Sequence, residues 1–128
     1  MNALLTFWKF SRPHTVIGSM ISIYTLYVII CAQNGIQHFP LLLIALLIGV
    51  SSNIFIVGIN QIADIDIDRI NKPQLPLPSG SLNLRQAKII VYSSLLISLG
   101  LALSVSPYLF MVIAFSTAIG WAYSKPRF

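Results

Sequence analysis

Long apolar runs separated by short polar segments make up most of the chain, and their lengths predict four membrane-spanning helices. The predicted spans cover residues of about 14–32, 40–64, 87–105 and 107–123. Each is close to the roughly 20 residues that a helix needs to cross about 30 Å of hydrocarbon. The last two spans are divided at Pro107, because the uncharged stretch around it is too long for one crossing. We therefore expect an all-α fold, a multi-pass transmembrane helix bundle of four spans that forms a single membrane domain over residues 1–128.

Segments outside the spans carry clear start and stop signals. Residues 1–11 predict a short helix lying in the membrane interface, with Trp8 as an anchor at the level of the headgroups. Pro13 then suits the first turn of a new helix. Residues 64–85 are expected to form a loop, since three prolines and a glycine between Asn71 and Gly80 favour extended backbone.

Composition agrees with a membrane protein, because 56% of the residues are hydrophobic and only 9% are charged. The net charge of +5 does not indicate nucleic acid binding, since the basic residues are not gathered into a patch with interleaved aromatic residues. With four spans, all eight basic residues fall on one side of the membrane: Lys9, Arg12, Arg69, Lys72, Arg85, Lys88, Lys125 and Arg127. The positive-inside rule makes that side, with both termini, cytoplasmic.

All three acidic residues of the chain, Asp64, Asp66 and Asp68, lie together where the second span ends. If the helix of that span continues through them, Asn60, Asp64 and Asp68 share one face and Asp66 points away. A carboxylate face at the end of a membrane helix suits Mg²⁺, which takes one or two carboxylates and completes its octahedron with water and phosphate oxygens. The expected ligand is a diphosphate carried by a lipid, and the expected metal ligands are Asp64 and Asp68.

Two other interpretations of this cluster are open on the residues alone. The carboxylates could belong to a solvated junction between helix and loop, where they balance Arg69 and Lys72 without binding anything. Alternatively, the alternation of Asp and Ile from Asp64 to Asp68 fits a strand. A lone strand beside a membrane span would leave its backbone groups unpaired, which disfavours that reading. Ionisable groups at membrane depth favour a functional site over the solvated junction.

The residues around the cluster also match a family pattern. The matching positions are Asn60, Gln61, Asp64, Asp68, Arg69, Asn71, Lys72, Pro73, Leu75, Pro76, Ser79 and Gly80. This string resembles the first aspartate-rich motif of the intramembrane aromatic prenyltransferases, the UbiA superfamily. Gln61 and the run from Asn71 to Pro76 resemble the homogentisate phytyltransferase branch. Two weaker matches are the segment Arg12 to Thr15 and the segment Ala122 to Ser124.

This resemblance implies a Mg²⁺-dependent transfer of a prenyl group from phytyl or geranylgeranyl diphosphate to homogentisate, on the path to tocopherols or prenylquinones. It places the protein in a plasma or thylakoid-type membrane. It implies catalytic roles for Asp64, Asp68 and Asn60, with Asp64 and Asp68 holding the metal. Lys72 and Arg69 would bind the diphosphate, and Arg12 and His14 would contact the aromatic acceptor.

One departure from the family pattern concerns the second aspartate-rich motif, which faces the first across a central cavity in the family. No second acidic cluster exists in these 128 residues. We therefore expect the chain to correspond to the N-terminal part of such an enzyme and to be inactive alone. A C-terminal half or another copy of the chain would be its partner in activity. The alternative is a non-catalytic four-span membrane protein that keeps the fold.

Overall fold

A computed structural model describes residues 2–124 of the protein, and no strand occurs among them. The helices are α1 (Ala3–Phe10), α2 (Pro13–Asn34), α3 (Phe39–Ala63), α4 (Ile65–Asn71), α5 (Pro76–Ser79), α6 (Leu84–Val105) and α7 (Pro107–Ser124). Four of them, α2, α3, α6 and α7, are long and apolar enough to cross a membrane. The all-α bundle with four candidate spans is therefore confirmed. Lys125 and Arg127, which entered the charge argument, lie outside the described residues.

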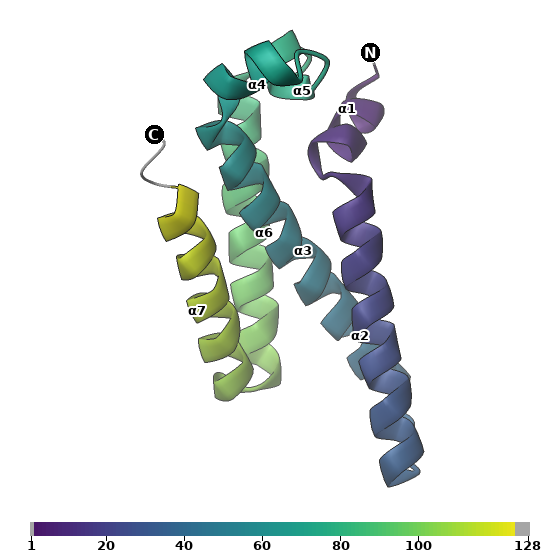
Figure 1. The fold of residues 1–128 in the computed structure, drawn as a ribbon. Coiled ribbons are helices and arrows are strands. Elements are labelled where there is room, and N and C mark those ends of the chain that lie inside the picture. The colour runs from purple at the N-terminus through teal and green to yellow at the C-terminus, as the bar shows by residue number, and fades with distance from the viewer. Residues whose placement is uncertain (1, 125–128) are drawn as a thin grey trace.

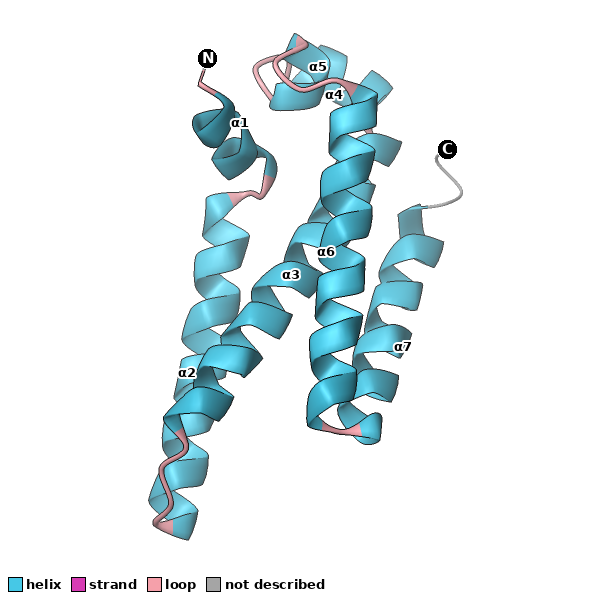
Figure 2. Ribbon diagram, turned by 180° about the vertical axis from the view of Figure 1, so that it is seen from behind, coloured by secondary structure: helices cyan, strands magenta, loops and turns pink. Residues whose placement is uncertain are grey.

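Helix α3 occupies the centre of the bundle and packs against α2, α6 and α7. It runs obliquely, so that one end lies beside α2 and the other beside the α6–α7 hairpin (Figure 1). The short helices α1, α4 and α5 gather at one end of the bundle, where α7 also finishes. The loops joining α2 to α3 and α6 to α7 lie at the other end (Figure 2). The aspartate cluster therefore shares its end of the molecule with the N-terminal helix.

The helix boundaries follow from local chemistry. Helix α6 starts with a capping box, in which the Asn83 side chain accepts from the Gln86 backbone at 2.8 Å and Gln86 accepts from Asn83 at 3.1 Å. This confirms the capping pair predicted from the sequence. The extended loop expected from Asn71 to Gly80 is wrong in part, because residues Pro76–Ser79 form the short helix α5. Proline is tolerated in a first helical turn, where the missing N–H would have no helical partner, and Gly80 ends the turn at φ 85°.

A hydrophobic cluster sits at the end of the bundle that carries the aspartates. Its buried members are Phe10, Phe55, Ile59, Leu77, Leu82, Ala87 and Val91, drawn from α1, α3, α5, α6 and the linker before α6. Gly58 of α3 lets these parts approach, because a Cβ there would lie 2.5 Å from Val91 and 3.2 Å from the Phe10 ring. The short helices are thus packed onto the spans by a common core.

Polar contacts join α2 and α3 in the lipid-spanning part of the bundle. The Asn53 side-chain amide donates to the Thr15 hydroxyl at 3.0 Å, and both residues are half-buried. Gly49, one turn earlier on α3, packs directly against Ile23 of α2. The small and amide residues at four-residue spacing therefore serve helix association. The side-chain amide of Asn53 is engaged by this contact.

Candidate functional site

The helix that carries the aspartates is interrupted at the first of them. Helix α3 ends at Ala63, Asp64 takes φ −98° and ψ 14°, and α4 begins at Ile65. The condition stated above, one continuous helix through the cluster, is therefore not met. The four-residue pattern of backbone hydrogen bonds nevertheless continues across the break. The Asp64 N–H donates to the Asn60 carbonyl at 3.0 Å, and the Asp68 N–H donates to the Asp64 carbonyl at 2.8 Å.

Because these four-residue bonds persist through the break, Asn60, Asp64 and Asp68 follow one another along a single side of the backbone. Lys72 extends the series, since its N–H donates to the Asp68 carbonyl at 2.8 Å. Asn60, Asp64 and Asp68 are half-buried, whereas Lys72 is exposed. The structure thus brings together the residues predicted to bind metal and one of the two cations predicted to bind diphosphate.

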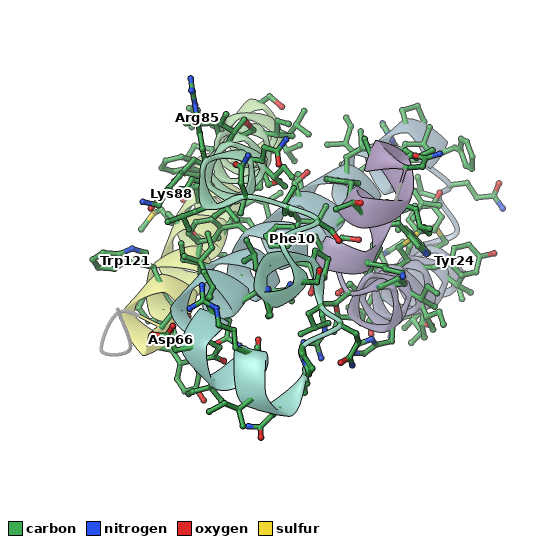
Figure 3. The ribbon with its side chains drawn as sticks, turned by 90° about the horizontal axis from the view of Figure 1, so that it is seen from above. Phe10, Tyr24, Asp66, Arg85, Lys88 and Trp121 are labelled. Carbon is green, nitrogen blue, oxygen red and sulfur yellow. The ribbon has the colours of Figure 1, made fainter. Side chains whose placement is uncertain are left out.

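Asp66 lies away from this group. Its carboxylate is 94% exposed and forms an ion pair with Arg69 at 3.1 Å, within the same short helix (Figure 3). This agrees with the expectation that Asp66 points away from the face of Asp64 and Asp68. Arg69 is therefore engaged by Asp66 in this structure, and Lys72 is the motif cation on the side of Asp68.

The electrostatics of Asp68 show which charges surround it. Partial burial, and next the neighbouring Asp64 carboxylate, raise the pKa of the Asp68 carboxyl above its ordinary value. The positive charges of Lys72 and Arg12 act in the opposite direction and lower the pKa of Asp68. The Asp68 carboxylate is thus repelled by the carboxylate of Asp64 and attracted by two cations. One is Lys72, at the end of α4, and the other is Arg12, at the junction of α1 and α2.

Arg12, whose charge acts on Asp68, has an unusual backbone geometry. It adopts φ 57° and ψ 80°, which is uncommon outside glycine, and it is followed by Pro13. The Arg12 carbonyl accepts from the Thr15 hydroxyl at 2.8 Å, and that hydroxyl in turn accepts from Asn53. His14, the other residue predicted to contact an acceptor, is exposed.

Gln61 is a residue whose role only the structure makes clear. The sequence offered nothing for it beyond its place in the motif pattern. Its side chain is 4% exposed and donates to the Phe10 carbonyl at 2.6 Å. This bond joins the last turn of α3 to the end of α1, two residues before Arg12. A buried amide in an otherwise apolar run was the available signal, since such a group needs a partner.

The donor set fits one hard divalent cation. Two half-buried carboxylates of like charge gain most from a cation placed between them, and an amide oxygen lies one turn away on Asn60. Among residues 2–124 no group of three or more His, Cys, Asp or Glu side chains could hold a metal. Further ligands of a bound Mg²⁺ would be water and substrate phosphate oxygens, as Mg²⁺ commonly prefers.

Comparisons with known proteins agree with this arrangement. The profile of the UbiA prenyltransferase family matches residues 20–128. Homogentisate phytyltransferase of Synechocystis sp. is 38% identical over 131 residues, which cover 98% of this chain and 42% of that protein. A probable homogentisate phytyltransferase of Oryza sativa is 41% identical, covering 96% of this chain and 31% of its own length. Homogentisate geranylgeranyltransferase of Hordeum vulgare is 35% identical, over 97% and 31% respectively.

A solved structure also matches closely. The structure reported for a digeranylgeranylglyceryl phosphate synthase in membranes superposes with a TM-score of 0.89 at 30% sequence identity. The superposed region covers 98% of this chain and 44% of the chain of that structure. The chain therefore spans less than half the length of the relatives it matches.

Proposed function

Because the chain belongs to the UbiA prenyltransferase family, we propose that it supplies the diphosphate-binding half of an aromatic prenyltransferase. The substrate is phytyl or geranylgeranyl diphosphate, and the acceptor is homogentisate. The observation that carries the proposal is the half-buried face of Asn60, Asp64 and Asp68, flanked by two cations at one end of a membrane bundle. Its alternative, a solvated junction, gives no reason for two like charges to share a half-buried face.

The residues of this chain divide the work of binding and ionising the diphosphate. Asp64 and Asp68 would hold Mg²⁺, and Asn60 would orient one of these carboxylates or bind the metal directly. When bound, Mg²⁺ neutralises the charge that collects on the diphosphate as the allylic carbon–oxygen bond breaks. Lys72 and Arg12 add charge-assisted contacts to the phosphate oxygens. In this arrangement Arg12 serves the diphosphate, whereas the sequence suggested a contact with the acceptor.

Binding of geranylgeranyl diphosphate to the purified chain tests this proposal. We expect weak binding that requires Mg²⁺ and disappears with a chelator, because the carboxylates hold the phosphate only through the metal. Geranylgeraniol, which has the same prenyl chain without the phosphates, is the matched control and should not show the Mg²⁺ requirement. Binding that ignores both the metal and the diphosphate would refute the proposal.

We also propose that the aspartate motif and both termini face the cytoplasm. The basic residues Lys9, Arg12, Arg69, Lys72 and Lys88 support this orientation, since they lie with the motif, whereas the two opposite loops have no charged residue. In a variant with Cys31→Ser, a cysteine at Gln37 should react only with reagent added from the far side of the membrane. A cysteine at Leu75 should react only from the near side. Reaction of both from the same side would contradict the four-span topology.

A further inference from the structure

A second surface of the bundle, on the outer face of α6 and α7, has features of a binding site. It consists of two adjoining grooves of about 530 and 320 Å³ that share Tyr92. The first groove lies at the motif end of α6, where Arg85 and Lys88 border apolar side chains. The second continues between α6 and α7 and is lined mainly by Tyr92, Leu95, Leu99, Ala114, Ala118 and Trp121. One surface thus combines a cationic end with an apolar groove.

The cationic end is exposed and separate from the aspartate motif. Arg85 and Lys88 stand one turn apart on α6, and both side chains are exposed. In the view from above they point outward from α6, with Trp121 next along the same edge of the molecule (Figure 3). The nearby acidic residue Asp66 forms its ion pair with Arg69 of its own helix. Arg85 and Lys88 therefore present positive charge to whatever lies beside the bundle.

The apolar part is long enough to cross the hydrocarbon of one membrane leaflet. From Arg85 to Leu99 the helix rises about 21 Å, at ~1.5 Å per residue. Half of a bilayer's hydrocarbon core is about 15 Å thick, which leaves the basic residues at headgroup level. Along this stripe Ile89 is 58% exposed and Tyr92 44% exposed. Trp121, at the same end of α7, is 38% exposed and has the position of an interfacial aromatic.

We propose that this surface binds a phospholipid with a net negative headgroup, its phosphate on Arg85 and Lys88 and one acyl chain in the groove between α6 and α7. Charge complementarity selects the headgroup, since two adjacent cations favour an anionic over a zwitterionic lipid. The groove selects a lipid over free phosphate, because an acyl chain buries the apolar wall. The site is distinct from the aspartate motif and does not depend on the function proposed for it.

Native mass spectrometry of the purified 128-residue chain tests this site. The chain is supplied with equal amounts of phosphatidylglycerol and phosphatidylcholine of the same acyl chains, and the retained lipid is counted. We expect a preference for phosphatidylglycerol that falls about fivefold with Lys88→Gln and about 25-fold when Arg85→Gln is added, from the usual contribution of a basic residue near an anionic surface. Lys9→Gln removes one charge from α1 at the same end and should leave the preference unchanged.

A further variant tests the apolar groove without altering charge. Ala118→Phe, at an exposed position of the groove wall, should lower retention of phosphatidylglycerol while the circular dichroism of the protein stays the same. The proposal is overturned if the double variant keeps its preference, or if Lys9→Gln reduces it equally. It is also overturned if Ala118→Phe leaves the retention of phosphatidylglycerol unchanged, because the apolar groove would then play no part and the cations would be binding phosphate alone. Formation of a dimer that excludes lipid from this surface would overturn it as well.

Discussion

Alanine at Asp64 or at Asp68 is expected to abolish Mg²⁺-dependent binding of prenyl diphosphate to the chain. Each substitution removes one of the two carboxylates on the half-buried face, and a single carboxylate leaves the cation weakly held. Removing one member of a desolvated charge contact typically costs about 2–5 kcal/mol, which is a loss of about 30-fold or more in affinity. Isothermal titration with geranylgeranyl diphosphate and Mg²⁺ measures this loss.

Asp66→Ala provides the matched control for these two variants. It removes the same charge from the same cluster, but its carboxylate is 94% exposed and pairs with Arg69. An exposed pair of this kind contributes little to stability, so binding should change by no more than a few-fold. An equal loss in all three variants would show that only the total negative charge matters, and the assignment of Asp64 and Asp68 would be wrong.

The second large effect concerns catalysis. We expect the purified 128-residue chain to transfer no prenyl group to homogentisate, and co-expression with the C-terminal part of a homologous enzyme to restore measurable transfer. A prenyl diphosphate carries about three negative charges and needs metal ions that themselves require carboxylate ligands. This chain supplies three acidic residues in all, and one of them points away. Product formation from labelled homogentisate measures the outcome.

The matched control is the same co-expression with Asp68→Ala in this chain. If restored activity depends on the face described above, this variant should return the signal to background. Robust transfer by the purified chain alone would contradict the expectation and would indicate a cavity assembled from two copies. Transfer that survives Asp68→Ala would show that restored activity does not need the Asp68 carboxylate.

Much of the fold could be predicted because it depends on residues that are close together in the sequence. Apolar runs of membrane length define the spans, and the break at Pro107 follows from the absence of a backbone donor. The capping pair of Asn83 and Gln86 needs only residues three apart. The grouping of Asn60, Asp64 and Asp68 was also predictable, since four-residue periodicity survives the change of helix at Asp64.

Other features depended on contacts between distant parts of the chain. The charge of Arg12 acts on Asp68 from a distant part of the sequence, and neither the left-handed backbone at Arg12 nor the docking of α1 has a sequence period. The partner of Gln61 is 51 residues away, so no local pattern points to it. Helix α5 forms in a segment rich in proline because Pro76 and Leu77 are buried against neighbouring elements. Long-range packing overrode local propensity there.

The bond between Gln61 and the Phe10 carbonyl has a mechanical consequence. Helix α1 exposes Leu4 and Trp8, which suits a helix floating at the boundary between headgroups and acyl chains. Phe10, by contrast, is completely buried in the cluster beneath the motif. Because Gln61 fixes α1 to the end of α3, we expect an interfacial α1 to set how deeply Asp64 and Asp68 lie in the membrane. The carboxylates would then lie at the height of lipid phosphates, where the proposed prenyl diphosphate would reach them by lateral diffusion.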